Sequence, residues 1–177
     1  MRALVVYESM FGNTEAVARA IAAGLAEQLQ VELRVVTHAP PMLTEAVDLL
    51  VVGGPTHAFS MSRPSTREQA FEQGATRDEP NTGLREWLTG LGEGAPVQAV
   101  AVFDTRVARA RLLPGSAAKK AAKMVRALGY VAAGRKSFWV ENSQGPLLPG
   151  EVEQATGWGG ELARDVAARA PGASAPH

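Results

Sequence analysis

The sequence contains no cysteine, so disulfides, thiolate chemistry and cysteine-bound metal or iron–sulfur sites are excluded. It has no apolar run long enough to span a membrane, and its N-terminus has the pattern of a strand rather than of a secretory signal. The formal net charge is +0, which argues against a nucleic-acid binder that works through overall charge. The histidines lie far apart, without the spacing of a metal site. We therefore expect a cytoplasmic protein without a bound metal that binds neither membranes nor nucleic acid.

The charged residues are nevertheless distributed unevenly along the chain. Between Thr105 and Leu128 every charged residue is basic. The simplest interpretation is the solvated face of a helix together with the loop that precedes it. The alternative is a docking patch for an acidic partner or an anionic substrate. The basic residues of this region are Arg106, Arg109, Arg111, Lys119, Lys120, Lys123 and Arg126.

Apolar, β-branched runs alternate with helical patterns, which predicts an α/β fold with a parallel sheet. Several runs are almost continuously apolar, as is typical of strands covered on both faces. Val17, Ile21 and Leu25 recur every fourth residue and mark the apolar stripe of the first helix. The expected strands are Arg2–Tyr7, Val31–Thr37, Asp48–Gly54, Val97–Asp104 and a fifth around Arg135–Glu141. The expected helices are Glu15–Leu29, Gly83–Leu91, Ser116–Leu128 and Pro149–Arg169.

This alternation predicts a doubly wound, five-stranded parallel sheet of order 2-1-3-4-5 with helices on both faces, because crossovers between parallel strands are right-handed. Ligands bind such sheets beyond the carboxyl ends of the strands, so the loops after strands one, three and four should line one site. Residues 1–169 are assigned to this domain, and the Ala-, Gly- and Pro-rich residues 170–177 to a disordered tail. The long segment Arg63–Thr82 is expected to form either a short helix with a lid or a simple excursion.

The turn after the first strand predicts a phosphate site that lacks a cation. Ser9, Asn13 and Thr14 carry side-chain donors. Gly12 allows the backbone to approach a ligand closely, and the helix that follows directs its unpaired N–H groups into the same turn. No Lys or Arg occurs from Ala3 to Val17, whereas an ATPase-type loop needs a Lys after its last Gly. A terminal monophosphate therefore fits better than a triphosphate; the alternative is an ordinary turn whose polar residues cap a helix.

The same residues resemble the FMN-phosphate signature of the flavodoxin family. That signature has aliphatic residues, an aromatic, a hydroxyl residue, a small residue and Thr, followed by Ala and a further aliphatic residue. The matching residues are Val5, Tyr7, Ser9, Gly12, Thr14, Ala18 and Ile21. Phe11 stands where many flavodoxins have another Thr. The resemblance implies that FMN is the cofactor and that its phosphate is held by Ser9, Met10, Phe11, Gly12, Asn13 and Thr14.

The loop after the third strand is expected to contact the flavin ring. A Gly-Gly-Pro sequence ends the strand and is followed by hydroxyl and aromatic side chains. A flat isoalloxazine needs an aromatic face to stack on and backbone donors and acceptors at its edge. The family resemblance continues here and puts His57 on the usual stacking position. For Phe59, an exposed loop aromatic without a ligand is the alternative. The expected ring contacts are Pro55, Thr56, His57, Ala58, Phe59 and Ser60.

The loop after the fourth strand departs from the flavodoxin pattern. Asp104 matches the family, but no Tyr or Trp follows it to cover the outer face of the flavin. The resemblance therefore implies ring contacts by Asp104, Thr105 and Arg106 and an outer face that is open or is approached by Arg106 or Arg109. A cation near the ring would raise the reduction potential of the flavin. The alternative is that Asp104 only caps the loop and that Arg106 is an ordinary surface residue.

These resemblances imply a short-chain flavodoxin-like protein, because no long insertion interrupts the fifth strand. We expect an FMN-binding electron carrier that shuttles electrons between redox partners and needs no catalytic residue of its own, since the cofactor supplies the chemistry. A redox partner protein, acidic by charge complementarity, is expected to dock near the basic 105–126 region. Two alternatives stay open: an FMN-dependent NAD(P)H:quinone-type oxidoreductase, and an interaction module whose FMN binding is weak or lost.

Overall fold

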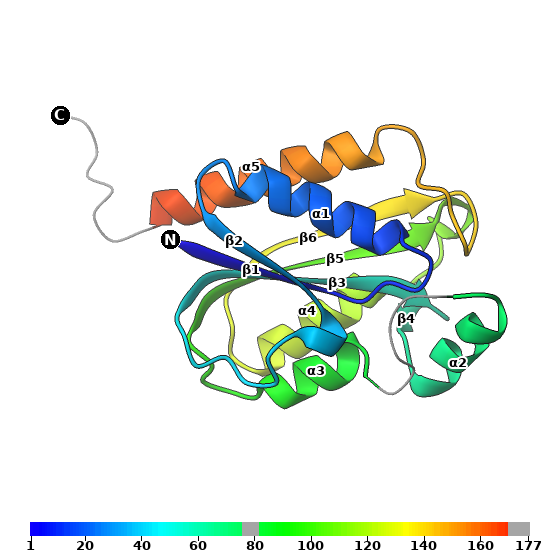
Figure 1. Ribbon diagram of the computed structural model, residues 1–177, viewed down its shortest axis with the longest axis horizontal. Coiled ribbons are helices and arrows are strands. Elements are labelled where there is room, and N and C mark those ends of the chain that lie inside the picture. The colour runs from blue at the N-terminus through cyan, green and yellow to red at the C-terminus, as the bar shows by residue number, and fades with distance from the viewer. Residues whose placement is uncertain (76–81, 170–177) are drawn as a thin grey trace.

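A twisted parallel sheet forms the centre of the protein (Figure 1). The computed structural model describes residues 1–75 and 82–169, so the expected tail at 170–177 and part of the Arg63–Thr82 segment lie outside the described residues. The strand order is β2-β1-β3-β5-β6, which confirms the predicted 2-1-3-4-5 winding. A short strand, β4, pairs antiparallel with the end of β3. The bounds are β1 Arg2–Tyr7, β2 Gln30–Val35, β3 Val47–His57, β4 Ser60–Met61, β5 Val97–Val107 and β6 Ala132–Val140.

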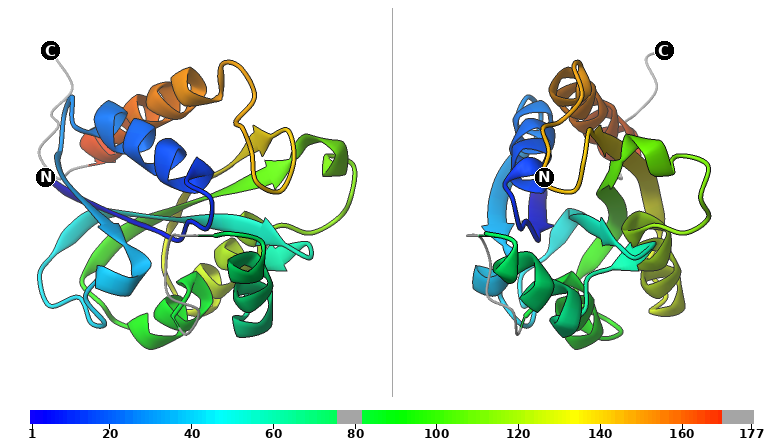
Figure 2. Two further views of the ribbon diagram at one scale, coloured as in Figure 1. Left: turned by 45° about the vertical axis from the view of Figure 1, so that its right-hand side comes forward. Right: turned by 90° about the vertical axis from the view of Figure 1, so that its right-hand side faces the viewer.

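Helices cover both faces of the sheet, as Figures 1 and 2 show. Helices α1 (Asn13–Leu25) and α5 (Glu151–Arg169) lie on one face, and α3 (Leu84–Leu91) and α4 (Ala117–Ala127) lie on the other. Helix α2 (Pro64–Glu72) stands apart from both layers, at the end of the sheet where the strands terminate. Two single-turn helices, Val36–His38 and Ala108–Ala110, follow β2 and β5. Among the described helices, none is long and apolar enough to cross a membrane.

The core under α1 and α5 depends on close helix packing. The predicted stripe of Val17, Ile21 and Leu25 is completely buried against the sheet. The two helices can approach closely because glycines face each other: a Cβ on Gly24 would collide with the Thr156 carbonyl oxygen, and one on Gly159 with the backbone of α1. These glycines therefore allow α5 to pack closely against the C-terminal half of α1.

Strands β3 and β5 extend further than the sequence pattern predicts. The expected ends were Gly54 and Asp104, but the strands reach His57 and Val107. The cause is pairing between strands: β5 continues to pair with β6 as far as Val107 and Val140, which compensates for the polar composition of this stretch. Residues expected in loops therefore lie on rigid strand ends, at the edge where the candidate site is found.

Candidate cofactor site

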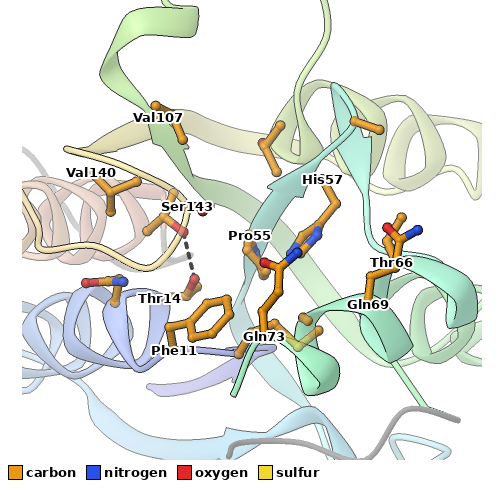
Figure 3. Close-up of a pocket in the computed structure, with 16 residues that line it drawn as sticks. Phe11, Thr14, Pro55, His57, Thr66, Gln69, Gln73, Val107, Val140 and Ser143 are labelled. Carbon is orange, nitrogen blue, oxygen red and sulfur yellow. Dashed lines mark hydrogen bonds between the residues drawn. The ribbon is translucent and has the colours of Figure 1, made fainter. Parts of the chain in front are cut away.

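A pocket of about 240 Å³ lies beyond the carboxyl ends of β1, β3 and β5. Figure 3 shows Phe11 and Thr14 of the first loop on one side of the pocket and Thr66 and Gln69 of α2 on the other. This is the edge of the sheet at which the strand order reverses, where ligands of doubly wound proteins bind. The lining residues are Met10, Phe11, Asn13, Thr14, Pro55, Thr56, His57, Ala58, Thr66, Gln69, Ala70, Gln73, Thr105, Val107, Val140 and Ser143.

The first loop presents the start of α1 to this pocket. Gly12 has a φ of 88°, a left-handed conformation that glycine adopts without steric cost. The Ser9 hydroxyl accepts the Glu15 N–H at 3.2 Å, so Ser9 caps one N–H in the first turn of α1. Among the described residues, nothing accepts the N–H groups of Asn13 and Thr14, as expected for the first turn of a helix. These donors and the positive end of the helix dipole are available to an anion.

Two hydrogen-bonded links connect the first loop to the rest of the site. The hydroxyls of Thr14 and Thr105 are 2.7 Å apart and buried, and this contact connects the start of α1 to β5. Asn13 Nδ2 donates to the Gln144 carbonyl at 2.9 Å, and Gln144 Nε2 donates to the Gln73 carbonyl at 3.2 Å. The segment after β6 therefore connects the start of α1 with the end of α2.

His57 is the single titratable side chain among the lining residues that the structure describes. It ends β3, and Figure 3 shows the Gln73 side chain extending toward it from the end of α2. Burial lowers the pKa of His57 below its usual range, and the positive charge of Arg67 lowers it further. The imidazole is therefore neutral at neutral pH and can offer a flat, uncharged face to a ring.

Asp104 lies behind the pocket rather than in its wall. The carboxylate is completely buried; its Oδ2 accepts the Thr56 hydroxyl at 3.0 Å and the Ala118 N–H at 2.9 Å. The Thr56 hydroxyl in turn accepts the Ala117 N–H at 2.9 Å. Asp104 therefore accepts a hydrogen bond from an otherwise unpaired N–H in the first turn of α4 and orients Thr56, which lines the pocket.

Arg106 is also directed away from the pocket. Its Nη2 donates to the carbonyls of Ala110 at 3.1 Å and Leu113 at 3.2 Å. The guanidinium lies 5.4 Å from the centre of the Trp139 ring, within cation–π range. Arg106 thus organises the loop that follows β5, and the neighbouring Arg109 is exposed.

The structure brings most of the predicted cofactor residues to one pocket. The predicted residues outside its lining are Ser9, Gly12, Phe59, Ser60, Asp104 and Arg106. Helix α2 and the residue that follows it supply a wall that the sequence motifs did not indicate, formed by Thr66, Gln69, Ala70 and Gln73. The signal for this helix is Pro64 at its first position, where a missing N–H costs nothing. Val107 and Val140 were also missed, because pairing between β5 and β6 brings them to the pocket, and Ser143 lies in the segment that follows β6.

A buried polar network connects α2 to the sheet. Arg67 is completely buried, and its Nη1 donates to the Ser62 hydroxyl at 2.8 Å. Ser62 in turn donates to the carboxylate of Glu8, which also accepts the Leu84 N–H at 2.8 Å. Burial raises the pKa of Glu8, and the hydrogen bonds from Ser62 and Leu84 oppose this rise. The network holds α2 at a defined distance from the first loop.

The donors around the pocket suit a phosphate monoester joined to a flat ring. Neutral donors and a helix start at Gly12 to Thr14 would hold the phosphate, and His57 and Phe11 would offer ring faces. Among the described residues, no cluster of His, Cys, Asp or Glu could hold a metal ion. The residues present therefore fit FMN, whose phosphate carries the negative charge and whose isoalloxazine is flat.

The chain is similar to known proteins in both sequence and structure. The sequence model of the flavodoxin family matches residues 5–138. A flavodoxin from the domain Archaea is similar in structure, with 19% identity, a TM-score of 0.62 and coverage of 94% of this chain and 99% of the other. A short-chain flavodoxin associated with a non-canonical PDU bacterial microcompartment has 14% identity, a TM-score of 0.63 and the same coverage.

A flavone reductase shares 14% identity and a TM-score of 0.54, with coverage of 94% of this chain but 63% of the other. No curated protein matches the chain in sequence. The family match extends over most of the chain and includes the first loop, β3 and β5, so the resemblance noted in the sequence is confirmed. The chain belongs to the flavodoxin family and is an FMN-binding redox protein.

Proposed function

We propose that this protein is an electron carrier that binds FMN noncovalently and passes electrons between partner proteins. FMN supplies one- and two-electron redox chemistry when bound. The chain's own residues then have three tasks: to hold the phosphate at the start of α1, to flank the ring, and to leave access for a partner.

One observation carries this proposal: the described lining of the pocket is uncharged. It consists of apolar, hydroxyl and amide side chains and of His57, which is neutral at neutral pH. An enzyme that takes a hydride from NAD(P)H must also bind a charged pyrophosphate, for which Arg, Lys or a glycine-rich helix start is the usual solution. The helix start in this pocket is the expected FMN phosphate site. A carrier needs neither a second anion site nor a proton donor.

The absorption spectrum of the purified protein is the first test. A flavin spectrum, or its appearance after FMN is added to a colourless preparation, supports the proposal. A protein that stays colourless and does not take up FMN would instead be an interaction module with the flavodoxin fold.

Stopped-flow mixing of the FMN-loaded protein with NADH and NADPH is the second test. A carrier is reduced at a negligible rate by either nucleotide and rapidly once a flavodoxin reductase is added. Fast bleaching by a nucleotide alone would refute the carrier proposal and identify the protein as a reductase.

The reductase stays the second candidate because of His57. A neutral imidazole at the edge of a redox pocket can donate a hydrogen bond from its N–H to the oxygen of a quinone-type acceptor and so polarise it. The structural likeness to a flavone reductase lends this reading further support. The stopped-flow experiment distinguishes the two candidates, because a carrier has no fast reaction with nucleotide.

A further inference from the structure

Beside the pocket, three large apolar side chains are exposed on two touching loops. Phe59 is 51% exposed, Leu112 97% and Leu113 47%. Phe59 belongs to the turn between β3 and β4, and the two leucines belong to the loop between β5 and α4. The loops are in contact, since a Cβ added to Gly115 would lie 3.1 Å from Cβ of Phe59. In the right-hand view of Figure 2, the loop after β5 projects from the side of the molecule at this end of the sheet.

The backbone of Phe59 is in the left-handed region, which is unfavourable for a residue with a large side chain. Ala58 and Phe59 have φ values of 44° and 62°, and they connect the paired residues His57 and Ser60. A two-residue hairpin of this type normally contains Asn-Gly or Asp-Gly, because positive φ strains residues with larger side chains. Phe at this position exposes an aromatic ring at a cost in backbone energy, which points to a role outside the fold.

The leucine loop is held in place despite its exposure. Arg106 bonds to the carbonyls of Ala110 and Leu113, and Leu113 N–H donates to the Ala110 carbonyl at 3.1 Å. The guanidinium of Arg111 lies 4.7 Å from the centre of the Trp139 ring. A loop held at several points loses little entropy on binding, so its exposed leucines are prepared for contact.

The exposed charges that neighbour the two leucines in the chain are all positive. The sequence from Thr105 to Val140 contains no Asp or Glu. Among the described residues, no ion pair involves a basic residue of this stretch. The exposed cations nearest to the leucines in the chain are Arg109, Arg111, Lys119 and Lys120. An apolar centre flanked by positive charges is suited to a partner with an apolar patch and negative charges, because complementary charges steer association.

We propose that Phe59, Leu112 and Leu113 with Arg109, Arg111, Lys119 and Lys120 form the docking face for an acidic redox protein. The partner carries carboxylates around an apolar centre and has its redox group close to that surface. Ala58, next to Phe59, and Val107, at the end of β5, both line the pocket. The docking face therefore adjoins the pocket, and a docked partner lies beside the cofactor. This inference rests on the proposed function, because only a carrier needs a partner protein at this edge.

Electron transfer to two acceptors of opposite charge tests the charge of the face. The photoreduced, FMN-loaded protein is mixed by stopped flow with plant plastocyanin, which is acidic, and with mitochondrial cytochrome c, which is basic. The second-order rate constant for plastocyanin should fall as salt is raised, and that for cytochrome c should not, because salt screens attraction between opposite charges. Equal salt dependence for both acceptors would overturn the proposal.

Two double variants separate the positive charges from the apolar centre. Arg109→Glu with Lys119→Glu should lower the plastocyanin rate constant about tenfold at low salt and raise that of cytochrome c. Leu112→Ser with Leu113→Ser should lower the plastocyanin rate about threefold, largely independent of salt. The matched controls are Arg164→Glu with Arg169→Glu on α5 for charge and Met42→Ser, an exposed apolar residue in the loop before β3, for the apolar centre. Controls as slow as the test variants would contradict the assignment.

A binding measurement without electron transfer tests the docking face independently of the carrier function. Plastocyanin is added to the ¹⁵N-labelled, oxidised protein at low salt, and the amide shifts should change at Phe59, Arg109–Leu113, Gly115 and Lys119–Lys120. Shifts confined to other elements would overturn the docking face even if FMN transfers electrons. Tighter binding of single-stranded DNA or anionic vesicles than of plastocyanin would also overturn it, because the face would then recognise polyanions. Failure to bind FMN would refute the carrier proposal.

Discussion

The buried guanidinium of Arg67 lies 3.1 Å from the carboxylate of Glu86, at the start of α3. Through this ion pair and the hydrogen bonds of Ser62 and Glu8, helix α2 is attached to the sheet. Helix α2 forms one wall of the pocket, so this network anchors that wall although none of its members lines the pocket. Arg67 is buried but Glu86 is partly exposed, so the pair itself stabilises little. Loss of Arg67 is nevertheless costly, because the buried carboxylate of Glu8 would lose its nearby positive charge.

Replacement of Arg67 by Met should therefore destabilise the protein and weaken FMN binding together. The methionine keeps much of the apolar stem, while Glu86 and Ser62 lose their partner; we expect a loss of about 3 kcal/mol in the free energy of unfolding. Urea unfolding of the apoprotein and fluorescence titration with FMN measure the two effects. The control is Arg19→Met, which removes an exposed pair with Glu15 and should cost at most about 0.5 kcal/mol. Equal losses in both variants would contradict the role of the network.

His57 should titrate below the range of a free imidazole. Its pKa is lowered by burial and by Arg67, so the folded state favours the neutral form. The stability that this group contributes is then present above the unfolded pKa of about 6.5 and is lost as the pH falls through the folded pKa. The imidazole resonance followed by NMR should have its midpoint below about 6.5. His57→Phe should remove part of the stability loss between about pH 7 and pH 5. A titration midpoint at or above the pKa of a free imidazole would show that His57 is exposed to water or lies beside a negative charge.

Loss of the Thr14 hydroxyl should weaken FMN binding without disrupting the fold. Thr14→Val keeps the shape of the side chain but removes a donor at the start of α1, and one charge-assisted hydrogen bond corresponds to about a tenfold change in the dissociation constant. Thr14→Ser should retain affinity. Thr105→Val removes the hydroxyl that Thr14 contacts at 2.7 Å and distinguishes a positioning effect from direct contact. Unchanged affinity in Thr14→Val would mean that the phosphate lies elsewhere.

Substitution of Asp104 should lower the stability of the apoprotein more than it weakens FMN binding. Its carboxylate accepts bonds from Thr56 and from the first turn of α4, so Asp104→Ala should lower the unfolding free energy of the apoprotein by about 2 kcal/mol. Asp104→Asn keeps one acceptor and should cost less. Ser116→Ala removes the neighbouring cap of the same helix and should cost about 1 kcal/mol. An apoprotein of unchanged stability with weaker FMN binding would instead support the direct contact expected from the sequence.

The sequence by itself determined the sheet order and the first loop. Apolar runs alternating with helical stripes permit few topologies, because parallel strands need right-handed crossovers, and the turn from Ser9 to Thr14 lies at the one edge that such a sheet offers. These features are local or follow from general rules of chain connection, so a single sequence is sufficient to predict them.

Only the tertiary structure decided what Asp104, Arg106 and Arg67 do. A charged side chain at a strand end can face a ligand, a helix start or solvent, and the choice depends on neighbours that are distant in sequence. Asp104 turns to α4, Arg106 to the carbonyls of its own loop, and Arg67 enters the space between α2 and α3. Because a buried charge must be paired wherever the fold provides a partner, its role follows from packing rather than from the motif in which it occurs.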